Sequence, residues 1–375
     1  MKAICISCFD YYDNRMKSVI AYLESKGYET KYIIADFNHF SKSYYRVDRS
    51  NTEQIHVLSY KNNISIKRLL SHVFFSRGVE EILWKYKPSL VYCMIPPNSL
   101  AKHISNYKKK NTECKIIFDV YDMWPESMPA KKIETIEKIP FKFWANLRNN
   151  GLLNADLITT VSYSAKEIIS KWVDGKEIPI EVIYPVIRDI RRPEYSFRTH
   201  GALSLCYLGN INYITNIDFM LNLIGKIRKH TEVRIHFIGG GMNLNDLTDK
   251  LDKIGVEVVR HGVVFDTIEK NKIFSMCDMG LNLPKKEVKS SMSLKSVEYL
   301  RAGLPFINTG VGDNWEMIEN EMIGINVSSE NTDTVAEKIA NLSADDIGFM
   351  HKCCIATYEK LFIGQDMDKI LKPVL

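Results

Sequence analysis

Short apolar runs alternate with longer segments of helical spacing along most of the chain. Ala3–Cys8, Leu90–Met94 and Leu203–Leu208 are apolar runs of strand length. Segments such as Ile64–Tyr86 and Ile217–Lys229 instead carry apolar residues three or four positions apart, as one face of a helix does. Repeated strand and helix units of this kind predict an α/β fold with parallel sheets.

The alternation begins twice, which predicts two Rossmann-like domains. Pro185–His200 has four arginines, two prolines and no apolar period, as a linker does. We therefore predict an N-terminal domain at residues 1–185, a linker at 186–200 and a C-terminal domain at 201–343. Residues 344–375 have a helical pattern, with Gly348 and Gly364 as expected interruptions.

Composition narrows the class of protein. The 375 residues are 45% hydrophobic and 25% charged, as in globular proteins, and no apolar run approaches the ~18 residues that would span a membrane. We expect eight unpaired cysteines and a cytoplasmic protein without a signal peptide, and Cys5 and Cys8 lack a second ligand pair for a metal. No basic cluster with stacking aromatic residues predicts nucleic-acid binding.

The stretch Ser293–Ile307 reads as one helix that runs into one strand. Ser293 suits the N-cap, and Gly303 suits the left-handed position after the helix end. Leu294, Val297 and Leu300 have the spacing of a buried helix face. We expect these three side chains to pack against the sheet.

Lys295 and Glu298 are three residues apart and share a face of this helix. Ser290 and Ser293 are small residues at the helix start, where unpaired N–H groups suit a phosphate. Lys295 would add a positive charge, and Glu298 could accept from the two hydroxyls of a ribose, so a nucleoside diphosphate would fit. A surface ion pair between Lys295 and Glu298 explains the same spacing, and spacing alone leaves both interpretations open.

The run from Lys295 to Ile307 resembles the K-x-x-E-Y-x-x-x-G-x-P-x-I signature of family-4 glycosyltransferases of the two-domain GT-B type. The resemblance implies that Glu298 holds the ribose of a sugar nucleotide and that the helix start with Lys295 faces the diphosphate. Many members carry another glutamate eight positions earlier, which holds the donor sugar. Ser290 stands at that position here.

A second resemblance lies in the first domain. Asp122-Met-Trp-Pro-Glu126-Ser127 is similar to the D-x-W-P-E-S element of family-4 enzymes that build capsular and lipopolysaccharide glycans. It implies that Asp119 and Asp122 are catalytic candidates and that Glu126 lies on the acceptor side. Arg15, in a turn without glycine, is a further candidate for the acceptor or phosphate side. A turn and N-cap cluster explains these carboxylates without any catalysis.

Turns after strands in the second domain supply the remaining donor-site candidates. Gly209, Asn210 and Asn212 follow one strand, and Gly239–Gly241, with Gly240 at its centre, follow the next. Gly262-Val263 resembles the turn whose backbone meets the nucleotide base. Related enzymes often carry Arg and Lys after the first of these strands, and their absence here makes Lys295 the principal cation.

The resemblance implies a GT-B fold and retaining transfer of a sugar from a UDP-, GDP- or dTDP-sugar to a glycan or polyprenyl-diphosphate-linked acceptor, as in surface polysaccharide assembly. It also implies that the helices at 344–375 cross back toward the N-terminal domain, and it calls for no cofactor and no metal. The alternatives are a nucleotide-sugar epimerase of the same fold, a degenerate transferase, a sugar-binding protein and an NAD-dependent dehydrogenase. The last lacks a G-x-G-x-x-G at its first helix, and nothing resembling a secretion signal favours a sugar-binding protein.

The first domain also predicts contact with an anionic membrane. Tyr44, Tyr45, Lys67 and Arg68 place aromatic and basic side chains in and near the helical region Ile64–Tyr86. A helix that packs on the sheet and turns a basic face to water explains the same pattern.

Overall fold

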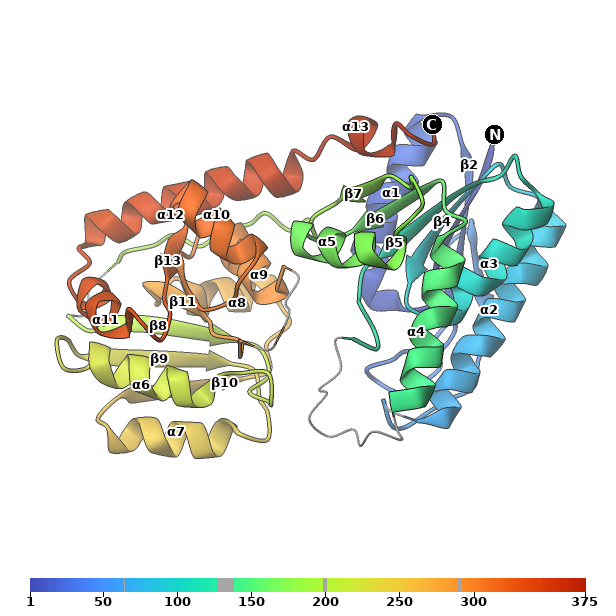
Figure 1. The fold of residues 1–375 in the computed structure, drawn as a ribbon. Coiled ribbons are helices and arrows are strands. Elements are labelled where there is room, and N and C mark those ends of the chain that lie inside the picture. Colours follow the sequence, from blue (N-terminus) through green and yellow to red (C-terminus); the bar gives the residue numbers. More distant parts are fainter. Residues whose placement is uncertain (64, 127–137, 198–200, 287, 289–291) are drawn as a thin grey trace. The chain divides into compact units, whose positions relative to one another are not determined.

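The computed structural model describes all residues except 64, 127–137, 198–200, 287 and 289–291 (Figure 1). The chain forms two compact units. The first unit comprises Met1–Tyr184 and Asp366–Leu375, and the second comprises Pro185–Gln365. Each unit is built around its own parallel sheet, so the predicted α/β fold with two parallel sheets is confirmed.

The sheet of the first unit has the strand order β3-β2-β1-β4-β5-β6-β7. Every neighbouring pair in it is parallel. The strands are β1 (Lys2–Ser7), β2 (Glu29–Ala35), β3 (Thr52–Ile55), β4 (Leu90–Ile95), β5 (Lys115–Val120), β6 (Leu157–Thr160) and β7 (Ile180–Val182).

Helices flank this sheet on both sides. They are α1 (Asp13–Ser25), α2 (Ile66–Tyr86), α3 (Asn98–Lys110), α4 (Lys138–Leu152), α5 (Tyr163–Trp172) and α13 (Met367–Leu371). Helices α2, α3 and α4 lie side by side (Figure 1). The terminal helix α13 is fixed to α1, because the Tyr22 hydroxyl donates to Asp368 Oδ1 at 2.5 Å and Leu371 is fully buried in the core of this unit.

The sheet of the second unit has the strand order β10-β9-β8-β11-β12-β13, again with parallel pairs throughout. Its strands are β8 (Leu203–Leu208), β9 (Val233–Ile238), β10 (Glu257–Gly262), β11 (Met279–Asn282), β12 (Phe306–Asn308) and β13 (Gly324–Asn326). Its helices are α6 (Ile217–Ile227), α7 (Leu244–Lys253), α8 (Thr267–Phe274), α9 (Leu294–Ala302), α10 (Asp313–Glu321), α11 (Thr332–Ala340) and α12 (Ala344–Tyr358), with a π-helical turn at Glu359–Ile363.

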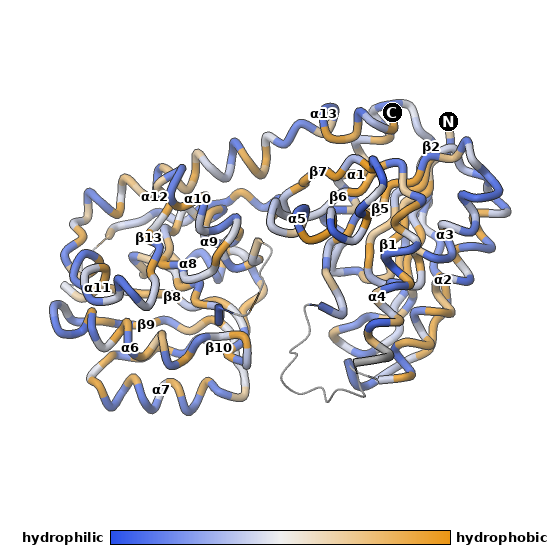
Figure 2. Tube along the Cα trace, viewed as in Figure 1, coloured by the Kyte–Doolittle hydropathy of each residue, from blue (hydrophilic) through white to orange (hydrophobic). Residues whose placement is uncertain are grey.

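The hydropathy pattern distinguishes the strands of the sheets from the helices outside them. The strands of both sheets are mainly hydrophobic, whereas an outer helix such as α7 alternates between hydrophobic and hydrophilic residues along its length (Figure 2). Strands covered on both faces by helices need apolar side chains in every position. β4 fits this rule, because all six of its residues are buried.

The sequence predicted most elements but not all. The predicted strand Leu203–Leu208 agrees with β8 residue for residue, whereas α4 and α5 were not predicted. Helix α12 runs through Gly348, so the predicted interruption there is wrong. The expected packing of Leu294 is also wrong, because its side chain is 59% exposed while Val297 and Leu300 are fully buried.

The two units divide at residues close to the predicted boundary. The division falls between Tyr184 and Pro185, and the described part of the predicted linker at 186–200 is counted with the second unit. Only Asp366–Leu375, rather than all of 344–375, join the first unit, because α12 packs against α9.

Three further properties concern the described residues. No helix among them is long and apolar enough to cross a bilayer. The eight cysteines are unpaired, and all but Cys353 are buried. No group of three metal-binding side chains occurs in the part of the chain that the structure describes.

Candidate functional site

The second unit has a single point at which its strand order reverses. The chain adds β9 and β10 on one side of β8, and β11, β12 and β13 on the other. The connections after β8 and β11 therefore leave in opposite directions and leave a gap at the carboxyl ends of these strands, which is where open α/β sheets bind ligands. Gly209 directly follows β8, and α9 follows β11.

Three predicted glycine turns meet at this end of the sheet. The Gly209 N–H donates to the Ile238 carbonyl at 2.8 Å, and the Gly239 N–H donates to the Gly262 carbonyl at 2.6 Å. The Ile211 N–H donates to the Gly240 carbonyl at 2.8 Å. Backbone hydrogen bonds thus join the turns after β8, β9 and β10, which the sequence predicted separately as donor-site candidates.

Two of these positions, Gly239 and Gly241, admit only glycine, and Gly239 has the shorter contact. A Cβ atom on Gly239 would lie 2.1 Å from the carbonyl oxygen of Gly209, and the residue has a φ of +137°. A side chain there would both collide with the backbone and force a conformation that other residues rarely adopt. Gly240 is different, because a Cβ on it would have nothing within 4 Å. The run of three glycines therefore combines a close backbone contact with an open position.

Helix α9 begins as predicted. The Ser293 hydroxyl accepts from the Ser296 N–H at 3.2 Å, which satisfies a donor of the first turn, and Gly303 ends the helix with a φ of +79°. Ser290 lies outside the described residues. The helix N-terminus has a partial positive charge that favours an anion.

Lys295 reaches from α9 to the turn after β8. Its ammonium donates to the Tyr207 hydroxyl at 2.9 Å and lies 4.1 Å from the centre of that ring. Its Cε would be 3.9 Å from a Cβ on Gly209. The structure therefore brings together the predicted cation and the predicted glycine turn, with a lysine charge that has no carboxylate partner among the described residues.

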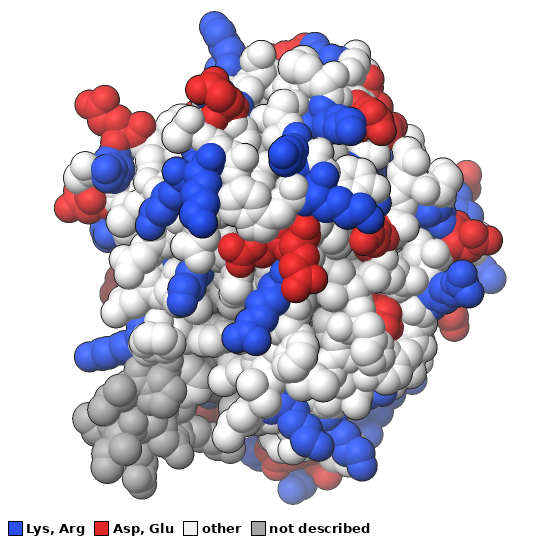
Figure 3. Space-filling model, turned by 90° about the vertical axis from the view of Figure 1, so that its right-hand side faces the viewer, with Lys and Arg blue, Asp and Glu red and all other residues white. Residues whose placement is uncertain are grey.

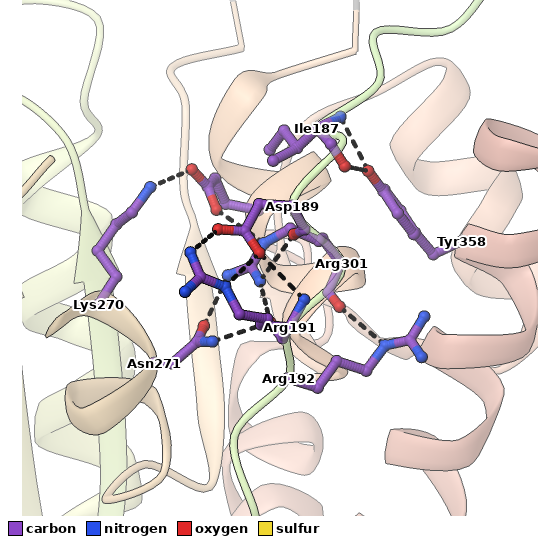
Figure 4. Close-up of polar contacts among 9 residues, drawn as sticks. Ile187, Asp189, Arg191, Arg192, Lys270, Asn271, Arg301 and Tyr358 are labelled. Atoms are coloured by element: carbon purple, nitrogen blue, oxygen red, sulfur yellow. Dashed lines mark hydrogen bonds and ion pairs between the residues drawn. The ribbon is translucent and has the colours of Figure 1, made fainter. Parts of the chain in front are cut away.

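Glu298 has different partners. The Lys270 ammonium donates to Glu298 Oε1, and Arg301 Nε donates to Oε2 at 3.2 Å (Figure 4). The Glu298 side chain is 15% exposed, so the carboxylate is largely buried but still accessible. Lys295 and Glu298 are therefore not the surface ion pair that their spacing allowed.

Arg301 anchors this cluster to the segment that precedes β8. Its guanidinium is fully buried and donates to Asn271 Oδ1 at 2.8 Å and to the Arg191 carbonyl at 2.6 Å. The Tyr358 hydroxyl donates to the Ile187 carbonyl at 2.7 Å (Figure 4). These bonds fix residues 187–191 to α8, α9 and α12, so Glu298 is held in place by buried groups rather than by surface contacts.

The remaining candidates of the second unit lie around the same turns. Asn210 is exposed, and Val263 is 65% exposed next to Gly262, whose φ is +71°. The side chain of Asn212 caps its own turn, because Oδ1 accepts from the Ile214 N–H at 3.0 Å. Asn212 thus fixes the loop shape, and its amide nitrogen is the part left to meet a ligand.

A histidine pair lies beside these turns. His236 Nδ1 and His261 Nε2 are 3.0 Å apart, and the two rings stack at an interplanar angle of 9°. Burial lowers the pKa of His236 to about 4 and also lowers the pKa of His261. The pair is therefore uncharged at neutral pH, which leaves Lys295 as the charged group nearest to the glycine turns among the residues described above.

In the first unit, two predicted site residues bind each other. Arg15 Nε donates to Asp119 Oδ2 at 2.8 Å, and its NH2 group donates to Oδ1 at 2.7 Å. The Tyr92 hydroxyl donates to Asp119 Oδ2 at 2.6 Å, and Arg15 also donates to the Ile183 carbonyl. Asp119 is fully buried and Arg15 is 8% exposed.

The position of this pair counts against two predictions, which stay predictions. A carboxylate with both oxygens bound and no exposed surface is not placed to meet a substrate, so the catalytic role predicted for Asp119 conflicts with its position. The same holds for the acceptor or phosphate role predicted for Arg15. The pair instead joins α1 to β5 and to the end of β7, in the interior of the sheet.

The other two predicted carboxylates of the first unit, Asp122 and Glu126, are less buried than Asp119. Glu126 accepts from the Arg148 NH2 group at 2.7 Å, and Arg148 is fully buried with its guanidinium 3.5 Å from the centre of the Trp172 ring. Asp122 is exposed and follows β5. Glu126 is also exposed, at 39% of its side chain, but it is paired with Arg148, so both Asp122 and Glu126 face solvent whereas Asp119 does not.

Two residues of the site were not predicted. Lys270 is only 8% exposed although it is a lysine, and Tyr207 lies in a strand that reads as wholly apolar. No sequence pattern links either residue to Glu298 or Lys295, because 28 and 88 positions separate them along the chain.

Comparisons with known proteins give this geometry a context. Residues 202–345 match the family model described as glycosyl transferases group 1. An uncharacterized glycosyltransferase of Methanocaldococcus jannaschii is 26% identical over 207 residues, which are 50% of this chain and 51% of that protein. The chain thus spans about half the length of this curated relative.

Solved structures are similar over the whole chain. HepE from Anabaena in complex with UDP has a TM-score of 0.69 at 11% identity, with 96% of each chain covered. WaaG, a glycosyltransferase involved in lipopolysaccharide biosynthesis, has a TM-score of 0.64 at 12% identity and covers 100% of this chain and 98% of its own. The predicted GT-B glycosyltransferase fold is confirmed, and membership of family 4 stays a prediction.

Proposed function

We propose that this protein is a retaining glycosyltransferase that moves a sugar from a nucleotide-sugar donor to a glycan or lipid-linked glycan acceptor in surface polysaccharide assembly. The observation that carries the proposal is the position of Lys295, whose ammonium lies beside the glycine turn after β8 at the reversal point of the sheet. A cation, a helix N-terminus and close-packed glycine turns together suit a diphosphate.

The donor class follows from this site. HepE has been solved with UDP and with UDP-glucose, which makes UDP the first nucleotide to test here, with GDP and dTDP as the others. We propose that the turns at Gly209, Gly240 and Gly262-Val263 face the nucleotide. Ser293 and Lys295 would then meet the diphosphate at the start of α9.

Glu298 retains the capacity to bind a ribose. An ionised carboxylate has about four acceptor positions, and Lys270 and Arg301 occupy one on each oxygen. Two positions are left for the 2′- and 3′-hydroxyls. Lys270 and Arg301 also orient the Glu298 carboxylate, and a charged acceptor forms the stronger hydrogen bonds.

The chemistry needs a leaving group that is stabilised as charge develops on it. The bond from the anomeric carbon to the diphosphate oxygen breaks, and Lys295 with the α9 N-terminus stabilises the departing diphosphate. An acceptor hydroxyl attacks from the same face and gives its proton to the departing phosphate, which retains the anomeric configuration. Asp122 is our candidate on the acceptor side, and Asp122→Asn should lower turnover with UDP affinity unchanged. Equal loss of both would place Asp122 on the donor side.

The proposal extends to the inner face of an anionic membrane, where a polyprenyl-diphosphate-linked acceptor would lie. Ile66, Leu70 and Phe74 recur every four residues on α2 and are 77%, 45% and 49% exposed, so they form an apolar stripe. Lys67 and Arg77 are exposed on the same helix. On the side of the first unit where α2 and α3 lie, Lys and Arg side chains are interspersed with Asp and Glu side chains and with uncharged surface (Figure 3).

The donor half of the proposal is tested by thermal unfolding of the full chain with UDP, GDP, dTDP and, as a control, free uridine. A nucleotide at 100 times its dissociation constant adds ~2.7 kcal/mol of stability. We expect one diphosphate to raise the melting temperature and uridine to do so far less. Stabilisation by none of the three diphosphates would contradict a nucleotide-sugar donor.

The products then separate the alternatives. Incubation with the matching UDP-, GDP- or dTDP-sugar should release the nucleoside diphosphate only when an acceptor is present. An epimerase would yield a second free sugar nucleotide without any acceptor. A degenerate protein would bind the nucleotide and produce neither.

A further inference from the structure

The first unit also has a point at which its strand order reverses, between β1 and β4. Arg68 of α2 lies close to aromatic rings in the segments that follow β1, β3 and β5. Its guanidinium carbon is 5.8 Å from the ring centre of Phe9, 6.0 Å from that of Tyr60 and 5.7 Å from that of Trp124. We call Arg68 with these three rings the arginine cage. The rings come from three separate segments of the chain.

The charge of Arg68 is not neutralised inside the cage. Its Nε donates to His72 Nε2 at 3.4 Å and its NH1 group donates to the Asn63 carbonyl at 2.8 Å, and no carboxylate of the described residues forms an ion pair with it. Asp10, which follows Phe9, instead accepts from Asn38 at 2.6 Å. Cation–π contacts favour the guanidinium but leave its net charge in place. A partly buried cation of this kind is suited to an anionic ligand.

A second donor in the same place lacks a partner. Because His72 Nε2 accepts from Arg68, the ring proton belongs on Nδ1. His72 is 1% exposed, and its Nδ1 has no hydrogen-bond partner among the described residues. A buried donor without an acceptor is costly, and it is one that a ligand oxygen would satisfy.

The N-terminus of α3 borders the cage. Asn98, its first residue, is fully buried and donates through Nδ2 to the Trp124 carbonyl at 2.9 Å, while its Oδ1 has no partner in the described part of the chain. Ser99 donates to the His72 carbonyl at 3.3 Å. A 13-residue helix presents a partial positive charge at this end, and its first turn has no acidic residue.

Exposed rings continue from the cage towards solvent. Tyr11 stacks on Phe9 with ring centres 5.2 Å apart, and Phe40 lies 5.2 Å from Tyr11. Tyr11 is 40% exposed and Phe40 is 72% exposed. Aromatic faces of this kind pack against the apolar face of a sugar or a prenyl chain.

We infer that the arginine cage binds a phosphate or diphosphate ester group carried by the acceptor, with Arg68 and His72 Nδ1 as its donors and the α3 N-terminus behind them. The inference rests on the proposed transferase function and specifies its acceptor as an anionic one. The arrangement in the second unit for the donor diphosphate is separate, because it uses Lys295 and the glycine turns.

The test measures binding to the full chain by calorimetry with UDP present at saturation, so that the donor site is filled. The titrants are farnesyl diphosphate, farnesol and inorganic pyrophosphate. We expect farnesyl diphosphate to bind and farnesol not to bind. Arg68→Met should weaken the binding of farnesyl diphosphate by at least tenfold, because hydrogen bonds to a charged group are lost. It should leave the affinity for UDP unchanged.

The matched control is Arg46→Met, which removes an exposed arginine from the same unit and should change neither affinity. Arg68→Lys keeps the charge but loses the planar fork, so it should retain part of the binding and provides a folded variant if Arg68→Met unfolds. Circular dichroism identifies the folded variants.

Each adverse outcome is distinct. The inference would be overturned if Arg68→Met and Arg46→Met weakened the binding of farnesyl diphosphate equally. It would also be overturned if farnesyl diphosphate did not bind to the unaltered protein. Arg68-dependent binding of pyrophosphate without binding of farnesyl diphosphate would make the cage a site for a free anion and would overturn the acceptor assignment. Failure of UDP to bind at all would instead contradict the proposed function.

Discussion

The two units have the same kind of sheet but differ in how they fill the point where the strand order reverses. In the second unit, the glycine turns after β8 and β9 lie next to this point, because Gly209 and Gly239 let the two turns approach to hydrogen-bond distance. In the first unit, side chains fill it, and the turn after β1 contains no glycine. Phe9 and Arg68 occupy the corresponding place there.

This difference matches two kinds of recognition. Backbone N–H groups at glycine turns bind a group that is the same in every nucleotide sugar, namely the diphosphate. Side chains can vary from one protein to another without disturbing the fold, and they suit the partner that must be distinguished. We therefore expect the second unit to depend on glycine positions and the first to depend on side-chain identity.

The first unit supports its side-chain site with a buried ion pair. Arg15 and Asp119 connect α1 to β5 directly below the end of the sheet that carries the predicted site. A buried pair costs desolvation to form, but breaking it by removing one partner leaves an uncompensated charge. The pair is thus a means of fixing the strand ends rather than a source of large net stability.

The largest effect that we predict is on stability and concerns this pair. Arg15→Met should lower the free energy of unfolding by ~3–5 kcal/mol, because Asp119 is left buried with only Tyr92 as a side-chain partner. Urea denaturation followed by circular dichroism measures it, with the slope checked for two-state behaviour in this two-unit chain.

Arg49→Met is the matched control. Arg49 pairs with Asp13 at 2.8 Å, but the two side chains are 42% and 23% exposed. An exposed pair of this kind contributes ~0–1 kcal/mol. A loss for Arg15→Met no larger than that for Arg49→Met would mean that the buried pair does not fix the sheet, and it would restore Arg15 and Asp119 as site candidates.

The next effect is on nucleotide binding by the second unit. Lys295→Ala and Glu298→Gln should each weaken the binding of the nucleoside diphosphate by roughly 10- to 150-fold. This range corresponds to ~1.5–3 kcal/mol for a hydrogen bond to a charged group. Lys295→Ala should have little effect on free uridine, because uridine has no phosphate. Calorimetry on the folded variants measures both.

A substitution of Lys270, the partner of Glu298, provides the control for Glu298→Gln. Glu298→Gln also disturbs Lys270 and Arg301, so a loss of affinity could reflect a disturbed cluster. Lys270→Met disturbs the same cluster but leaves the carboxylate and frees Oε1. If Lys270→Met weakens UDP as much as Glu298→Gln does, the glutamate acts through the fold and does not bind the ribose.

The sequence predicted the elements better than the contacts. Strands such as β4 are continuous apolar runs because helices cover both faces, and such runs are easy to recognise. Helix α5 was missed even though Ser162 caps it and its sequence carries an apolar face of helical spacing, which includes the buried Ala165 and Ile169. Leu294 was wrongly assigned to the packed face, because it is 59% exposed whereas Val297 and Leu300 are fully buried.

Site residues were predicted where a local motif carries them. Ser293 and Gly303 follow from capping rules, and the glycine turns follow from their places after strands. Lys270 could not be predicted, because a lysine in a helix normally points to water and only the tertiary fold brings it to Glu298. For the same reason the burial of Asp119 could not be predicted, because its partner Arg15 lies 104 positions away along the chain.

A smaller effect tests the dependence of the second unit on glycine. Gly239→Ala should weaken UDP binding and lower stability by ~1–3 kcal/mol, because a strained conformation and a contact with the Gly209 carbonyl are imposed together. Gly240→Ala is the neighbouring control, since its Cβ would meet nothing within 4 Å. Equal effects of the two substitutions would show that the close backbone approach is not needed for nucleotide binding.

The smallest effect concerns the membrane and applies to the first unit alone. Of the residues first predicted for this contact, Tyr44 and Lys67 are exposed, whereas Arg68 is engaged in the arginine cage and Tyr45 is partly buried. Lys67→Gln should therefore weaken sedimentation with anionic vesicles by about fivefold, which is the ~1 kcal/mol of one basic residue near such a surface. Raised salt should weaken it further, since charge interactions at the surface are screened.

Lys253→Gln provides the comparison, because Lys253 is an exposed lysine at the end of α7 in the second unit. Both variants lose one positive charge, so a general effect of net charge would lower vesicle binding equally in the two. A loss confined to Lys67→Gln would place the contact on α2, where the apolar stripe of Ile66, Leu70 and Phe74 can enter the headgroup region. Equal losses, or equal binding to neutral vesicles, would remove α2 as the membrane contact and leave its exposed apolar residues without a role in acceptor capture.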